Sequence, residues 1–184
     1  MSTEVARTYT ADEFAWLRDW KEFELIGGRL VPFHCGASAS HICGQLLSAV
    51  VTWGRSDCRA WAFGSGASYS CFPGRPHTVR RPWLSVIRGE RLRRDDIPSV
   101  GHFPFAPDVA GIVATPRHRY EEVAAWVADF RAAGVKLIWV ISPKSKTVLI
   151  RRLDGTCAEV GEAGTLSGED VLPGFACAVA ELFV

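Results

Sequence analysis

The sequence predicts a mixed α/β (α+β) fold with one central sheet, flanking helices and added hairpins. Two apolar runs, at residues 104–116 and 136–142, have the composition of strands that are buried on both faces. Between them, apolar side chains recur at intervals of three and four, as in an amphipathic helix: Tyr120, Val123, Val127 and Phe130. Gly134 is a typical helix end. A strand, a helix and a strand in this order favour a right-handed βαβ crossover.

The N-terminal segments predict smaller elements that precede this crossover. The motif TADE at residues 10–13 is a capping box, and it predicts a short helix that ends near Trp20. The segment FELIGGRLVPF has β-prone residues on both sides of Gly27 and Gly28, which predicts two strands joined by a tight turn. Apolar residues at helical spacing in 38–54 predict a second helix.

The remaining segments complete the predicted sheet. Residues 59–72 predict two strands broken at the glycines between 64 and 66. Residues 79–87, VRRPWLSVI, predict a strand with proline near its start, where a missing amide is tolerated. Residues 146–153 predict an amphipathic strand, and residues 170–183 predict a turn and a short helix that cap the sheet. With no linker or repeat, residues 1–184 are expected to form a single domain.

Composition excludes several classes of protein. The 21 basic and 20 acidic residues leave a net charge of +1, so a nucleic-acid surface must come from local clustering. The N-terminus lacks the apolar core of a signal peptide, and no apolar run approaches the roughly 20 residues of a membrane span. The six irregularly spaced cysteines are therefore interpreted as reduced, mostly buried thiols. These observations predict a cytoplasmic protein.

Familiar cofactor and catalytic motifs are absent. The chain has no phosphate loop, no dinucleotide glycine fingerprint and no Gly-x-Ser-x-Gly elbow. The segment HCGASASHIC contains residues of the types that bind zinc: His34, Cys35, His41 and Cys43. Their spacing matches no paired-knuckle pattern, and no second cluster completes a site, so no metal centre is predicted.

Seven arginines lie between residues 75 and 94. The acidic residues Glu90, Asp95 and Asp96 are interleaved with them, which favours a solvated loop with surface ion pairs. Arg80 and Arg81 differ from the others because they adjoin a predicted buried strand. These two arginines are candidates to line a groove.

The order and spacing of these segments resemble the Uma-two family of restriction-endonuclease-like proteins, within the PD-(D/E)XK nuclease superfamily. The resemblance runs from about Thr8 to Phe183. It is carried by FELIGGRLVPF, the His41 helix, VRRPWLSVI, APDVAGIVATP, YEEVAAWVADFRAAGVKLIWVISP and LPGFACAVAELF. It implies a restriction-endonuclease-like central mixed sheet and Mg²⁺-dependent cleavage of DNA.

The resemblance also implies three catalytic positions. The family's first catalytic strand reads Arg-x-Pro-Asp, the next carries a glutamate two residues after an alanine, and the following helix carries a lysine. The carboxylates hold Mg²⁺, the metal activates water, and the lysine adds positive charge near the phosphate. Here Trp83, Ile112 and Trp126 stand at these positions. The resemblance therefore predicts an inactive member whose former metal pocket is filled by aromatic side chains, with Trp83 and Ile112 on adjacent strands facing that pocket.

Three other positions keep the residue type of the family. Glu24 matches a glutamate of the first strand, His41 matches a histidine at the second helix, and Asp108 matches the Pro-Asp that opens the central strand. Structural roles are also open to them. Glu24 and His41 could pair across a cleft, and Asp108 could cap a turn.

Three functional readings stay open. The first is an inactive nuclease-fold protein that binds DNA weakly or acts as an interaction module. Its cleft would be lined by these basic residues: Arg80, Arg81, Arg117, His118 and Arg119. The second is an active Mg²⁺-dependent endodeoxyribonuclease with a displaced site, which would use Glu24, Asp108 and Glu121 or Glu122. The third is a structural homodimer without a ligand, formed through exposed strand edges. Mg²⁺ is expected only in the second reading.

Overall fold

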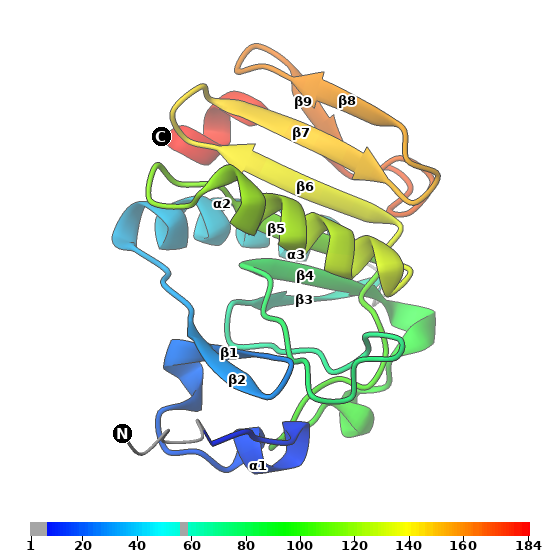
Figure 1. Ribbon diagram of the computed structural model, residues 1–184. Coiled ribbons are helices and arrows are strands. Elements are labelled where there is room, and N and C mark those ends of the chain that lie inside the picture. The colour runs from blue at the N-terminus through cyan, green and yellow to red at the C-terminus, as the bar shows by residue number, and fades with distance from the viewer. Residues whose placement is uncertain (1–6, 56–58) are drawn as a thin grey trace.

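A six-stranded mixed sheet forms the centre of the computed structural model, which describes residues 7–55 and 59–184. Its order is β3-β4-β5-β6-β7-β8 (Figure 1). The strands are β3 (Ala60–Gly64), β4 (Leu84–Arg88), β5 (Val109–Val113), β6 (Leu137–Ser142), β7 (Thr147–Arg152) and β8 (Cys157–Val160). β5 and β6 are parallel, and every other neighbouring pair is antiparallel. The predicted fold class is confirmed.

The predicted strand–helix–strand crossover is present. α3 (Tyr120–Ala132) connects β5 to β6, and every residue of β5 is buried. Gly134 has a φ of 89°, which an L side chain rarely adopts, so glycine suits the helix end. Tyr120 does not belong to the buried stripe, because it is the first residue of the helix and is 80% exposed. Trp126 and Phe130 supply the buried face instead.

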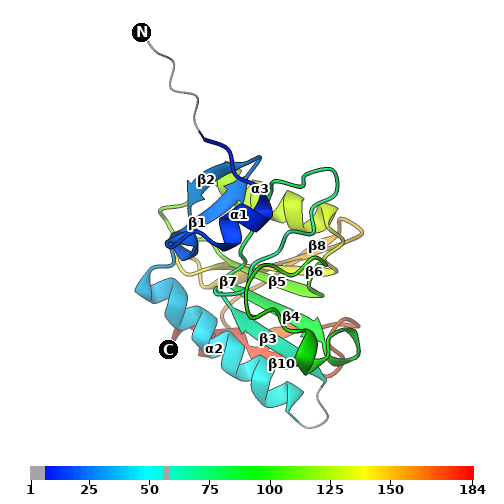
Figure 2. The same cartoon turned by 90° about the horizontal axis from the view of Figure 1, so that it is seen from below.

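The second helix, α2 (Ala37–Gly54), packs on the face of the sheet opposite α3 (Figure 1, Figure 2). Its buried residues repeat at helical spacing: Ala39, Ile42, Cys43, Leu46 and Val50. The prediction for this segment is confirmed. Among the described residues, no helix is both long enough and apolar enough to span a membrane.

The N-terminal segments form a small unit beside the sheet. The capping box at Thr10 and Glu13 starts α1 (Ala11–Ala15), which is shorter than predicted, and the 3₁₀ helix η1 (Trp20–Glu22) follows. β1 (Phe23–Ile26) and β2 (Arg29–Pro32) form the predicted hairpin. Its two turn residues have positive φ, 56° at Gly27 and 82° at Gly28, as a type I′ turn requires.

The hairpin is attached to the segment that leads into β4. Leu25 and Val79 exchange backbone hydrogen bonds of 3.0 and 2.7 Å. Their side chains form a separate apolar cluster with Phe14, and all three are fully buried. This attachment places Glu24 of β1 next to Arg80 and Arg81.

Residues 67–72 do not form the second strand that the sequence predicts after the glycine break. Tyr69 makes only isolated bridges, to Arg80 and Phe103. Both edges of β4 are already paired, with β3 and with β5, so β4 cannot accept a further strand. β4 also begins later than predicted, at Leu84 rather than at residue 79.

The C-terminal segment contains a strand that the sequence did not predict. β10 (Ala176–Ala178) pairs with β9 (Thr165–Ser167), and the 3₁₀ helix η4 (Val179–Phe183) follows. A strand of three residues is too short for periodicity to detect. The predicted turn and helix are present around it.

The cysteines are less buried than predicted. The described ones are free thiols, and Cys43 and Cys177 are buried, but Cys35 and Cys157 are exposed. Cys35 lies in the segment before α2, and Cys157 lies on the edge strand β8, so few other residues pack over either thiol. Cys58 lies outside the described residues.

The arginine-rich loop after β4 contains the 3₁₀ helices η2 (Gly89–Arg91) and η3 (Arg94–Asp96). Arg88 and Glu90 form one of the expected surface ion pairs, at 2.6 Å. Surface pairs of this kind contribute little to stability. The loop is largely solvated, as the sequence predicts.

We expect Gly28→Ala to lower the free energy of unfolding by about 1–2 kcal/mol, the cost of holding a side chain at positive φ. The added Cβ would also lie 3.2 Å from Thr8 Cβ. The matched change Gly44→Ala, on an open face of α2, should raise stability by up to about 1 kcal/mol. Urea denaturation measures both. Equal stability of Gly28→Ala and wild type would contradict the turn geometry.

Candidate functional site

An open cleft of about 1300 Å³ lies between the hairpin and the start of α3. The hairpin and residues 33–39 form one wall, and residues 115–126 form the other. The cleft is also lined by Glu24, Arg80, Arg81 and Trp126. The cleft therefore lies at the end of the sheet where β4 begins and β5 ends.

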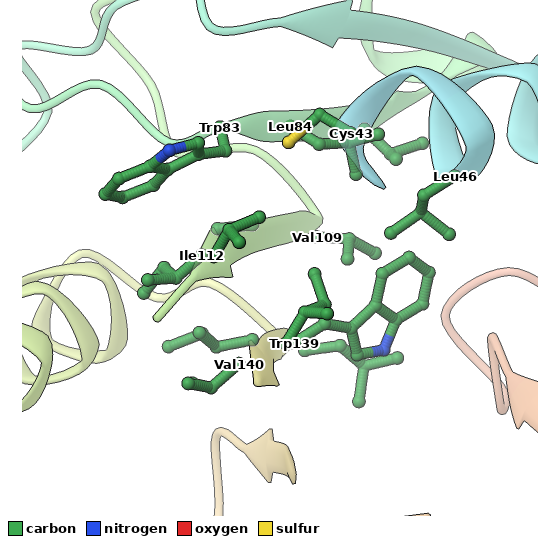
Figure 3. Packing of buried hydrophobic residues seen from close by; sticks show 14 of the residues in the cluster. Cys43, Leu46, Trp83, Leu84, Val109, Ile112, Trp139 and Val140 are labelled. Carbon is green, nitrogen blue, oxygen red and sulfur yellow. The ribbon is translucent and has the colours of Figure 1, made fainter. Parts of the chain in front are cut away.

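Trp83 and Ile112 have the predicted arrangement below this cleft. Leu84 pairs with Gly111, and the Trp83 amide donates to the Gly111 carbonyl at 2.9 Å, so the register places Trp83 opposite Ile112. Figure 3 shows both side chains on the same side of the strands, whereas Trp139 lies on the other side. Both residues are fully buried. The prediction that they lie side by side and share a face is confirmed, although Trp83 immediately precedes β4 rather than belonging to it, and neither residue lines the cleft.

Aromatic rings fill the space around Trp83. Its ring centroid lies 4.8 Å from that of Phe33, 4.9 Å from that of Trp126 and 5.4 Å from that of His118. Burial lowers the pKa of the His118 imidazole, although Glu122 acts in the opposite direction. Its Nδ1 lies 3.2 Å from the Thr115 amide, which donates to it. Phe33, Trp83, His118 and Trp126 are called the aromatic cluster below.

Glu24 is the carboxylate that borders the aromatic cluster. Its Oε2 accepts hydrogen bonds from Arg80 Nη1 at 2.7 Å and from Trp126 Nε1 at 2.8 Å. Its Oε1 accepts from the Arg81 amide at 2.7 Å. Burial raises the pKa of the Glu24 carboxyl group, although the Arg80 charge and these hydrogen bonds act to lower it. Because all three partners are donors, the geometry is that of the carboxylate form.

Arg80 joins Glu24 to α3. Its Nε and Nη2 lie 2.7 and 2.6 Å from Asp129 Oδ2, while its Nη1 holds Glu24. Arg75 forms a second ion pair with Asp129. Sequence reasoning missed Asp129. The available signal was an acidic residue three positions after Trp126, and therefore on the same face of the helix.

Arg81 is also turned inward. Its Nε and Nη2 donate to the Ser65 carbonyl at 3.2 and 2.6 Å, and its Nη1 donates to the Lys21 carbonyl. The guanidinium lies 5.2 Å from the Trp20 ring centroid and 4.9 Å from that of Phe33. Arg80 and Arg81 are 6% and 3% exposed. Their polar groups thus already have protein partners.

Arg117 and Arg119 are exposed, unlike the two buried arginines. Arg117 lines the cleft, and among the described residues it has no hydrogen-bond or ion-pair partner. Arg119 is the residue before α3, and its amide donates to Glu122 Oε2 at 2.7 Å. The exposed charges that line the cleft are balanced: Lys21 and Arg117 against Glu22 and Glu122.

His41 lies away from the cleft. Its Nε2 hydrogen-bonds to the carbonyl oxygen of Val184, so it does not pair with Glu24. The suggested pair across the cleft is therefore wrong. The reason is the direction of α2, whose exposed face at this position meets the C-terminal residues.

Asp108 lies at the other end of β5 from the cleft. It is fully buried and accepts from the Arg88 amide at 2.9 Å, and it pairs with Arg91 at 2.7 Å and Lys136 at 3.1 Å. Burial acts to raise the pKa of this carboxyl group, but those hydrogen bonds outweigh burial and hold the pKa below its ordinary value. Asp108 thus connects the end of β4 to the residue that precedes β6. It shares no hydrogen-bond or ion-pair partner with Glu24 among the described residues.

Glu121 and Glu122, the remaining candidates for a displaced metal site, share no hydrogen-bond partner with Glu24 among the described residues. Glu121 is exposed, and the Glu122 carboxylate accepts a hydrogen bond from the Arg119 amide at the start of α3. Within residues 7–55 and 59–184, no three His, Cys, Asp or Glu side chains form a group that could hold a metal ion. The structure thus does not bring together the residues of the displaced site.

Comparison with known proteins identifies similar chains. The model of the Uma2 family, described as "Putative restriction endonuclease", matches residues 11–180. The crystal structure of "a putative nuclease belonging to DUF820" from Anabaena variabilis ATCC 29413 is similar, with a TM-score of 0.79 and 20% sequence identity. The match covers 95% of this chain and 97% of that chain. At this identity, the structural likeness establishes the fold alone. No curated protein matches the chain.

We expect Glu24→Ala to lower the free energy of unfolding by about 3–5 kcal/mol. It removes one of the two carboxylates paired with the buried Arg80, and it leaves Arg80 Nη1, the Arg81 amide and Trp126 Nε1 without their acceptor. The control Glu22→Ala removes an exposed carboxylate two residues away and should change stability by no more than about 0.5 kcal/mol. Urea denaturation of both variants measures the difference. Similar losses in the two variants would show that the network contributes little.

Proposed function

Because the chain belongs to the Uma2 family, we propose that it keeps the nuclease fold of that family but does not hydrolyse phosphodiester bonds. One observation carries this proposal. The three positions that resemble the family's catalytic aspartate, glutamate and lysine hold Trp83, Ile112 and Trp126, and all three side chains are buried. Fold by itself does not carry activity, so the residues at the site decide.

The donor set at the aromatic cluster does not fit Mg²⁺. This ion requires near-octahedral oxygen ligands, usually including carboxylates and water. Phe33 and the adjoining Ile112 have no lone pair, and the indoles of Trp83 and Trp126 have only an N–H donor. The Nδ1 of His118 already accepts a hydrogen bond from the Thr115 amide. Glu24 borders the cluster, but both of its oxygens already accept hydrogen bonds from Arg80, Arg81 and Trp126. One carboxylate whose oxygens already accept hydrogen bonds is too few to hold Mg²⁺, and this supports the proposal that the protein does not cleave DNA.

Arg80 supplies the positive charge that the buried carboxylates require. Its guanidinium lies between Glu24 and Asp129, with contacts of 2.6–2.7 Å to both. A planar guanidinium suits this role, because its N–H groups address two carboxylates at once. The Trp126 N–H completes the set of donors around Glu24. The carboxylates of Glu24 and Asp129 thus accept hydrogen bonds from N–H groups of this protein and need no metal ion for their hydrogen bonding.

The displaced-site reading has less support. It requires Glu24, Asp108 and Glu121 or Glu122 to share one ion. Asp108 pairs with Arg91 and Lys136 beyond the far end of β5, whereas Glu24 pairs with Arg80 beside the cleft. No common partner connects the two groups. The inactive reading is therefore the one we propose.

Weak DNA binding is a further part of the proposal, but it would use fewer arginines than the sequence suggests. Arg80 and Arg81 are buried and satisfied, so they offer little to a phosphate. Arg117 and Arg119 remain exposed beside the cleft. Since the exposed charges that line the cleft balance, any DNA binding is expected to be weak. Contacts from these arginines to phosphates would make it non-specific and dependent on counterion release.

We expect the purified protein to leave linear, supercoiled and single-stranded DNA uncut with Mg²⁺ or Mn²⁺, because no group positions a metal-bound water. A gel assay with a chelator control checks this. Metal-dependent nicking that disappears in Glu24→Gln, Glu121→Gln or Glu122→Gln would contradict the proposal. Glu159→Gln, an exposed carboxylate on β8, is the matched control and should not alter any trace activity.

We expect affinity for a short DNA duplex to be weak and to fall steeply with salt. Arg117→Ala and Arg119→Ala should each lower it about equally for all sequences and reduce the salt slope by roughly one. Fluorescence anisotropy at several salt concentrations measures this. Arg93→Ala removes an exposed arginine beyond the far end of β4 and is the control. An equal loss in that variant would place the contact outside the cleft.

A further inference from the structure

We propose that His102 forms a pH-sensitive attachment, which holds residues 11–22 in place when its imidazole is neutral and loosens them when the imidazole is protonated. These residues contain α1 and η1 and are called the N-terminal segment below. The inference goes beyond the proposed function and does not depend on it. It concerns how this segment is held, not what the cleft binds or whether the protein cleaves DNA.

His102 contacts three residues of the N-terminal segment. Its Nε2 lies 3.1 Å from the carbonyl oxygen of Ala11. Its ring stacks on that of Phe14, with centroids 5.5 Å apart and planes inclined by 22°. It also meets the ring of Trp20 in an edge arrangement, with centroids 6.2 Å apart. Phe14 is fully buried, so the stacked ring of His102 helps to cover an apolar side chain.

The loop that carries His102 is fixed to the central sheet. His102 Nδ1 lies 2.7 Å from Ser68 Oγ. The amide of Phe103, the next residue, donates to the Ser68 carbonyl at 2.9 Å, and its ring stacks on that of Tyr69 at 5.3 Å. The Tyr69 hydroxyl donates to Ser85 Oγ on β4 at 2.7 Å. His102 therefore connects the N-terminal segment to a loop that the sheet holds in place.

The two partners of His102 favour the neutral imidazole with its hydrogen on Nε2. The Ala11 carbonyl can only accept a hydrogen bond, so Nε2 is the donor. Nδ1 then has a lone pair and accepts the hydrogen of the Ser68 hydroxyl. Protonation would place a second hydrogen on Nδ1, directed at Ser68 Oγ. Ser68 is 2% exposed, and its hydroxyl has no other hydrogen-bond partner among the described residues, so this change leaves a buried polar group unsatisfied.

The surroundings of His102 also disfavour its charged form. Burial is the largest influence, and it lowers the pKa of His102 below the ordinary value of 6.5. The Ala11 hydrogen bond and the charge of Asp12 on α1 act to raise this pKa, whereas the charge of Arg81 acts to lower it. Because the pKa is lowered in the folded state, the attachment has its full strength above about pH 6.5. It weakens as the pH falls from there toward the lower pKa of the folded state.

Loosening of the N-terminal segment would reach the cleft. The Trp20 ring centroid lies 5.2 Å from the Arg81 guanidinium, and the Lys21 carbonyl accepts a hydrogen bond from the same group. Lys21 and Glu22 line the cleft. One wall of the cleft thus includes residues that His102 helps to hold. Mild acid is therefore expected to loosen this wall.

Hydrogen–deuterium exchange with mass spectrometry at pH 7.5 and pH 5.5 tests the attachment. After correction for the intrinsic effect of pH, a peptide of the N-terminal segment should exchange several-fold faster at pH 5.5. The ordinary histidine pKa of the released state limits the increase to about tenfold. Carboxylates contribute little, because pH 5.5 lies above their ordinary pKa values of about 4. A peptide of β7 and β8, which contains no histidine, is the internal reference and should not change.

His102→Gln replaces the imidazole with an amide that can still donate to the Ala11 carbonyl but does not titrate. The ratio of exchange at the two pH values should therefore fall to about one. His77→Gln is the matched control, because His77 is exposed and acts on Glu13 of α1 rather than on His102. It should keep the wild-type ratio. Asp12→Asn removes a charge that favours the protonated form, so it should increase the ratio.

Equal exchange of the N-terminal segment at the two pH values would overturn the inference. A ratio in His102→Gln as large as in wild type would also overturn it, since another group would then be the one that titrates. If His102→Gln does not fold, the comparison of Asp12→Asn with wild type decides, and a decreased or unchanged ratio contradicts the inference. None of these measurements involves DNA or a metal ion, so the proposed function is tested separately.

Discussion

The buried ion pairs of Arg80 with Glu24 and Asp129 hold together three parts of the chain that are distant in sequence. Arg80 precedes β4, and its partners lie 56 residues before it on β1 and 49 residues after it on α3. Both carboxylates and the guanidinium are almost fully buried. Removal of Arg80 would leave the Glu24 carboxylate without an ion-pair partner in a medium that solvates it poorly. The walls of the cleft therefore keep a fixed relation to each other.

The same interaction shapes the chemistry that we propose for the site. Two buried carboxylates, Glu24 and Asp129, need a cation in this site. Here the cation is a guanidinium of the chain, and the Trp126 N–H completes the donors around Glu24. The aromatic cluster fills the adjoining space. In the proposed function, the fold has kept its buried charges and its cleft while the groups that would act on a phosphate are replaced.

Local elements were predictable because their causes lie within a few residues. The capping box at Thr10 and Glu13 starts α1, and the glycine pair at 27–28 adopts the positive φ values of its turn. The continuous apolar run at Val109–Val113 is a central strand with every residue buried. The segment at 67–72 failed the same reasoning, because its pairing is limited to isolated bridges from Tyr69 to Arg80 and Phe103, and such contacts between distant residues leave no local signal.

The sequence by itself determined that Trp83, Ile112 and Trp126 stand where the family resemblance places catalytic groups, since residue identity alone says that they cannot hold Mg²⁺. Only the tertiary structure decided which polar residues share the site. It turned Arg80 and Arg81 inward, added Asp129, and placed Asp108 and His41 elsewhere. The physical reason is that a charged side chain is directed by the partners that long-range contacts bring to it. Periodicity along one strand or helix carries no information about those partners.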